Sequence, residues 1–80
     1  MSDKIIEAFK ATLTAEVLAH RNEESAGQTA NFVKRCGEHR DRYLKKAGDD
    51  SALTASINAI ANGTIAAAKE RGVHIREVPL

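Results

Sequence analysis

The chain has no tryptophan, one tyrosine and two phenylalanines among its 80 residues. It also has a single cysteine, Cys36, which excludes an intramolecular disulfide scaffold and indicates a reducing compartment. One proline and five glycines exclude collagen-like and proline-rich chains. Twelve basic and eleven acidic residues give a net charge of +1, so there is no overall field to attract nucleic acid or a membrane surface.

The residues that are present suit one small globular domain. Hydrophobic residues make up 42% and charged residues 29% of the chain, close to globular averages. The first seven residues contain Asp3 and Glu7 and no apolar run, so we predict that they are not a secretory leader. We therefore expect a cytoplasmic protein. Fourteen residues are alanine, which contributes little apolar area to a core. A thin core in a short chain favours self-association as an added source of stability.

The residue pattern predicts three helices. The first is expected from Asp3 to His20, and the second from near Asn22, with Glu23 and Glu24 in its first turn, to Ala47. The third is expected from residues 49–51 to Arg71, before Gly72. The apolar stripe of the first helix consists of Ile6, Phe9, Leu13, Val17 and His20. That of the second consists of Ala26, Ala30, Val33, Cys36, Gly37, Tyr43, Leu44 and Ala47, and that of the third of Leu53, Ile57, Ile60, Ala61, Thr64, Ala67 and Ala68.

We therefore predict an all-α fold, a small three-helix bundle over residues 1–72 with an extended C-terminal tail over residues 73–80. No glycine or proline lies between Thr14 and Ala26, so residues 3–47 also suit one long helix. That alternative is a dimeric long-helix hairpin, because a partner chain would have to cover its second apolar face. Val73 and Ile75 alternate with polar residues, so the tail is expected to be an extended arm or a lone strand, free to add to the sheet edge of a partner.

The side of the third helix opposite its apolar stripe, which we call its back, is unusual. No residue from Ser51 to Ala68 is charged, although a surface helix normally turns charges to water. Asn58 and Asn62 make this stretch too polar for a membrane span. Its back consists of small residues, namely Ala52, Ala55, Ala59, Gly63 and Ala66. This surface is either an alanine face selected for helix propensity or a contact surface for a partner chain.

The second helix carries a local excess of positive charge, with six basic and two acidic residues between Asn31 and Lys46. Its basic residues, as candidates for contacts with nucleic acid, are Lys34, Arg35, Arg42, Lys45 and Lys46. The spacing of Glu38 from Lys34 and Arg42 predicts ion pairs along a solvated surface instead. Arg40 falls inside the apolar stripe, where it is expected to pair with Glu16 or Asp50 or to extend its stem to solvent at the helix end. The functional alternative is an anchor for a carboxylate or another anion of a partner.

Candidate chemistry is sparse. Cys36 and His39 are three residues apart, but His20 and His74 are distant in sequence, so we predict no metal site and a buried thiol beside surface histidines. No glycine-rich phosphate loop is present, and we predict neither a cofactor nor enzyme activity. The predicted function is a non-catalytic protein–protein interaction module, self-associating as a homodimer or acting on a larger partner as an adaptor or inhibitor. A small nucleic-acid-binding regulator is the alternative.

Overall fold

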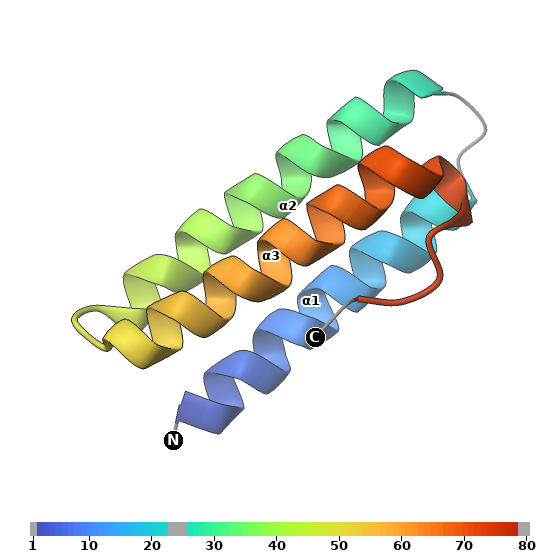
Figure 1. The fold of residues 1–80 in the computed structure, drawn as a ribbon. Helices are drawn as coiled ribbons and strands as arrows, with labels where there is room; N and C mark the ends of the chain where they lie inside the picture. Colours follow the sequence, from blue (N-terminus) through green and yellow to red (C-terminus); the bar gives the residue numbers. More distant parts are fainter. Residues whose placement is uncertain (1, 23–25, 79–80) are drawn as a thin grey trace.

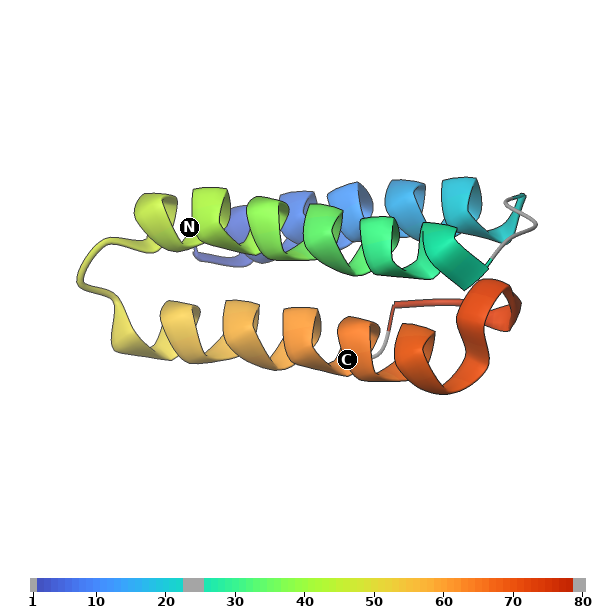
Figure 2. The ribbon, with the colours of Figure 1, turned by 90° about the horizontal axis from the view of Figure 1, so that it is seen from above.

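A computed structural model describes residues 2–22 and 26–78, and within these residues the chain forms the predicted all-α bundle (Figure 1). Its helices are α1 (Ser2–Arg21), α2 (Ala26–Ala47) and α3 (Ser51–Arg71), followed by the short 3-10 helix η1 (Gly72–His74). Seen from above, α1 and α2 form one layer, and α3 runs alongside them as the second layer (Figure 2). No helix within the described ranges is long and apolar enough to cross a membrane.

The ends of the helices follow from local chemistry. The side chain of Asp50 accepts a hydrogen bond of 3.0 Å from the backbone N–H of Leu53 and so caps the start of α3. Gly48 has a φ of +57° in the turn between α2 and α3, a conformation that glycine adopts without steric cost. Gly72 has a φ of +59° and its N–H bonds to the carbonyl of Ala68, which ends α3.

The long-helix alternative is wrong, because α1 ends at Arg21 and α2 begins only at Ala26. Asn22 closes the end of α1 in two ways. Its backbone N–H bonds to the carbonyl of Ala19, and its side-chain amide donates to the carbonyl of Leu18, both at 3.2 Å. The predicted place of Glu23 and Glu24 in the first turn of α2 lies outside the described residues.

The core contains the stripe predicted for α1, with Phe9, Leu13, Val17 and His20 buried and Ile6 packed at the edge. On α2 the prediction was partly wrong. Phe32 is fully buried although it was left out of the stripe, while Ala30 is exposed. The ring of Phe32 stacks on that of His20, with centroids 4.5 Å apart. This contact between helices sets which side of α2 faces α1.

The C-terminal segment is part of the bundle and not a free arm. After η1 it turns back along the helices (Figure 1), Ile75 is only 1% exposed, and Val78 packs against the core. No strand forms in the described part of this segment, so the predicted lone strand is wrong. Ile75 is thus part of the core, and the addition of this segment to a partner's sheet stays a prediction.

Replacing Ile75 by alanine tests this description of the tail. Removing a fully buried isoleucine side chain leaves a cavity, so Ile75→Ala is expected to lower the free energy of unfolding by about 2–5 kcal/mol. Urea denaturation measures the change, and Arg76→Ala, at an exposed neighbouring position, is the control. An Ile75→Ala chain as stable as the control would contradict a tail packed into the core.

Candidate interaction surface

The small residues predicted on the back of the third helix do lie together on the outside of the bundle. Ala52, Ala55, Ala59 and Ala66 are exposed and Gly63 is partly buried. We call these five residues the outer face of α3. The opposite side of the helix supplies the core residues Leu53, Ile57, Ile60, Ala61, Thr64 and Ala68. One side of α3 is thus packed against α1 and α2, and the other side is open to water and uncharged from Ser51 to Ala68.

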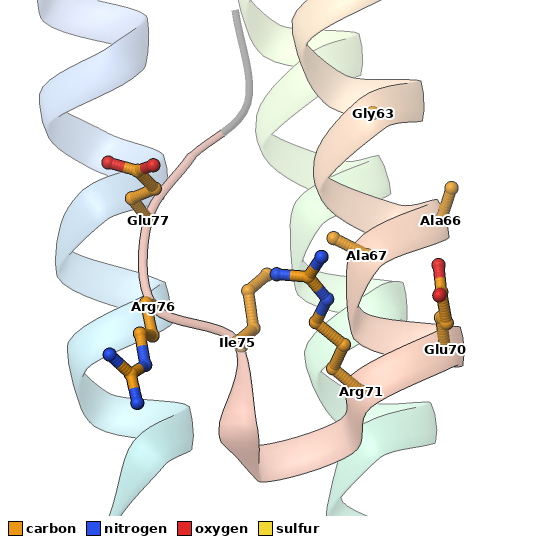
Figure 3. Close-up of a pocket in the computed structure, with 8 residues that line it drawn as sticks. All are labelled: Gly63, Ala66, Ala67, Glu70, Arg71, Ile75, Arg76 and Glu77. Carbon is orange, nitrogen blue, oxygen red and sulfur yellow. The ribbon is translucent and has the colours of Figure 1, made fainter.

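A shallow groove lies at the C-terminal end of this outer face (Figure 3). It is about 410 Å³ in volume, and small and apolar side chains line part of it, namely those of Ala66, Ala67 and Ile75 beside Gly63. The charged residues that line it are Glu70, Arg71, Arg76 and Glu77. The folded-back tail forms one wall of this groove. Sequence reasoning missed the groove because nothing in the local pattern predicts that the tail returns.

Arg40 is not at the position expected of it. Its Nε donates to Oδ1 of the neighbouring Asp41 at 3.3 Å, and its side chain is 31% exposed. The predicted pairing with Glu16 or Asp50 is wrong, because Glu16 binds Arg35 and His39 instead. Arg40 also lies on α2, outside the group of small residues on α3. The structure therefore does not bring Arg40 together with the outer face of α3.

The basic residues of α2 are not equivalent. Lys34, Lys45 and Lys46 are exposed, and the Nζ of Lys46 lies 4.7 Å from the centre of the Tyr43 ring. Arg35 donates through Nε to Oε2 of Glu16 at 2.7 Å, so its charge is matched within the bundle. Between the described residues no ion pair joins Glu38 to Lys34 or Arg42, so the predicted ladder along α2 does not form. Nucleic-acid binding by α2 stays a prediction. Fewer of its basic side chains are available for phosphates than the sequence predicts, because Arg35 is paired with Glu16.

A cluster of hydrogen-bonded polar side chains, which we call the Glu16 site, lies between α1 and α2. Oε1 of Glu16 accepts a hydrogen bond of 2.9 Å from Nε2 of His39, and Nδ1 of His39 accepts one of 2.6 Å from Nη2 of Arg42. A carboxylate can only accept and a guanidinium can only donate, so each ring nitrogen of His39 has a suitable partner. Burial by itself raises the pKa of Glu16, but the hydrogen bonds from His39 and Arg35 and the charge of Arg35 outweigh it and lower the pKa below its usual 4.5.

Cys36 lies on α2 beside this polar group and is fully buried. Burial, together with the nearby charge of Glu16, raises the pKa of the thiol to about 12. The predicted buried thiol is confirmed, but not every histidine is on the surface, because His20 is completely buried against Phe32. Within the described ranges no three His, Cys, Asp or Glu side chains converge as metal ligands.

Comparison with known protein families, with characterised proteins and with solved structures finds no match to this chain. The case for a function therefore depends on its own residues.

The buried thiol gives a chemical prediction. Because the thiolate is the reactive form and Cys36 has a pKa of about 12, alkylation of the folded chain at about pH 8 is expected to be on the order of a thousandfold slower than that of an unfolded chain. Mass spectrometry after iodoacetamide treatment, with and without denaturant, measures the two rates. Equal rates in both conditions would show that the thiol is accessible.

The Glu16 site gives a prediction about pH. Because the pKa of Glu16 is lowered in the folded chain, its stabilising effect is present above the usual carboxyl pKa and is lost as the pH falls through the lowered value. Acidification from about pH 6 to pH 3 should therefore cost the wild-type chain more free energy of unfolding than it costs Glu16→Gln. Glu38→Gln, which removes a carboxylate from the exposed side of α2, is the control. Identical pH profiles of wild type and Glu16→Gln would contradict the assignment.

Proposed function

We propose that this protein is a non-catalytic protein–protein interaction module that self-associates through the outer face of α3. The observation that carries the proposal is an 18-residue stretch, Ser51 to Ala68, that has no charged residue although half of the helix is exposed. Helices at a protein surface normally turn charged side chains to water. A second chain laid on this face would remove the alanine methyl groups from water.

Small side chains also set the kind of partner that fits. Alanine and glycine let two helix backbones approach to the low end of the usual separation of about 8–10 Å. Ala52, Ala55 and Ala59 follow one another at spacings of three and four residues, the pattern that keeps side chains on one side of a helix. A second helix of the same kind therefore fits better than an irregular loop or a bulky side chain.

The arrangement of the outer face favours a second copy of this chain in the antiparallel direction. Ala55 and Gly63 lie four residues before and after Ala59, and Ala52 and Ala66 lie seven residues before and after it. A two-fold axis at Ala59 would thus pair small residues with small residues along the whole face.

The charges at the two ends of α3 support the same direction. Asp49 and Asp50 are exposed at its start, whereas Lys69, Glu70 and Arg71 at its end carry one net positive charge. Antiparallel packing places the acidic end of each copy beside the basic end of the other, and parallel packing would place the acidic ends together. The free cysteine in the chain fits the reducing interior of a cell, and we place this association in the cytoplasm.

A charge at the centre of the face should abolish the association. Ala59→Glu would bury an unpaired carboxylate at the two-fold axis. We therefore expect the dissociation constant of the dimer to rise more than about tenfold, with the helical content unchanged. Sedimentation velocity and circular dichroism measure the two quantities. Ala30→Glu, at an exposed position on α2, is the matched control.

One rival surface exists on the back of α1. It carries exposed Ala11 and Ala15 beside Leu18, which is 52% exposed. Ala15→Glu places the same new charge on that surface. Dissociation by Ala15→Glu together with an intact dimer of Ala59→Glu would assign the interface to α1 and contradict the proposal.

A cysteine at position 59 tests the register. Across an antiparallel two-fold axis the two copies of residue 59 face each other at a separation that suits a disulfide. Ala59→Cys should therefore form a covalent dimer under mild oxidation. In Ala55→Cys the two cysteines would be about 12 Å apart along the helices, which is too far for a bond. Cys36 supplies no competing thiol, because it is buried. Equal cross-linking of both variants would contradict this register.

A further inference from the structure

A second hollow lies near the end of α1 and η1, and it shares Arg76 with the groove. It is an open space of about 530 Å³ lined by Arg21, Val73, His74 and Arg76. Three of these four residues carry basic side chains, and all three are exposed. They come from two segments more than 50 residues apart in sequence, the end of α1 and the end of the chain. The fold, and not the local sequence, brings these basic groups together.

The tail holds its two basic residues firmly. Ile75 lies between His74 and Arg76 and is 1% exposed, so its side chain fixes this part of the chain to the core. His74 ends η1 and Arg76 follows Ile75 in the chain, and both are exposed whereas Ile75 is buried. The turn before them is set by Gly72, which has a φ of +59°. The positions of His74 and Arg76 beside the end of α1 follow from this packing.

The charges in the hollow are not matched by the described part of the chain. No ion pair within residues 2–22 and 26–78 involves Arg21, His74 or Arg76. The nearest acidic side chain in sequence, that of Glu77, points away from that of Arg76 (Figure 3). The dipole of α1 favours a cation at Arg21, but it gives no reason for a second arginine beside it. Two guanidinium groups around one open space repel each other unless an anion lies between them.

We propose that this hollow binds a phosphate group, either as free phosphate or as the monoester of a small molecule. Arginine presents paired N–H donors that match the oxygens of phosphate, and an exposed histidine adds a further N–H donor. A phosphate dianion offers enough charge and enough acceptors for both arginines at once, whereas a chloride ion offers neither. The hollow shares no residue with the outer face of α3, although Arg76 lines both the hollow and the groove.

The test is a titration of the full chain followed by ¹H–¹⁵N NMR, with the ionic strength held constant by sodium chloride. Inorganic phosphate is expected to shift the backbone signals of Arg21 and residues 73–76 in a saturable way. The same titration is repeated with O-phosphoserine, a phosphate monoester. Tighter binding of O-phosphoserine than of inorganic phosphate would identify a monoester as the preferred ligand. Arg76→Gln should weaken phosphate binding about tenfold, because it removes a charge-assisted hydrogen bond. Arg71→Gln removes the same charge from the groove and should leave the affinity unchanged.

Three results would overturn the proposal. The first is the absence of saturable shifts with either phosphate compound. The second is an equal loss of affinity in Arg76→Gln and Arg71→Gln, which would indicate only a general effect of net charge. The third comes from Glu23→Gln with Glu24→Gln, which removes the two carboxylates that follow α1 in the sequence. Binding seen only in this double variant would show that the chain's own acidic residues fill the hollow.

Discussion

The packing of one half of α3 against α1 and α2 is the contact on which the rest of the structure depends. Leu53, Ile57 and Ile60 are buried there, and they are the only large aliphatic side chains that α3 contributes to the fully buried core. The opposite side of the helix carries the small residues of the outer face. The same arrangement that makes the bundle stable thus leaves an uncharged helix face in contact with water.

Contacts between aromatic rings and the burial of Ile75 compensate for the small number of large aliphatic side chains on α3. His20 stacks on Phe32 and Phe9 contacts Tyr43, so rings fill the seam between α1 and α2. Tyr43 keeps its hydroxyl hydrogen-bonded to Thr12 at 3.1 Å, which lets a ring with a polar end lie in the core. Ile75 closes the space that remains at one end. A chain of this size buries a modest fraction of its surface, and each of these contacts therefore matters for stability.

The sequence was sufficient where a local pattern decides the outcome. The buried row from Phe9 to His20 on α1 and the end of α3 at Gly72 were predicted, because helix periodicity and glycine conformation are local properties. On α2 the predicted stripe shares Cys36, Tyr43 and Ala47 with the observed one but misses Phe32. Which residues of α2 are buried depends on its packing against both α1 and α3, and these contacts are not local in sequence.

The wrong stripe on α2 also explains the wrong pairing predicted for Arg40. In the observed orientation His39 lies on the inner side of α2 and binds Glu16, while Arg40 is turned toward the edge and pairs with Asp41. The groove and the basic hollow could not be predicted at all, since both depend on the return of the tail, which Ile75 fixes through a contact far along the chain. The small residues on α3 were predicted as a group because they follow one helix, whereas their exposure at the surface depends on how the three helices pack.

The central claim is that a second copy of the chain covers the outer face of α3. The molar mass of the unmodified protein in solution, measured by light scattering over a wide range of concentrations, tests it most directly. We predict a value that rises with concentration from 8.6 kDa to twice that mass and then stays constant. A mass of 8.6 kDa at every concentration would contradict the claim.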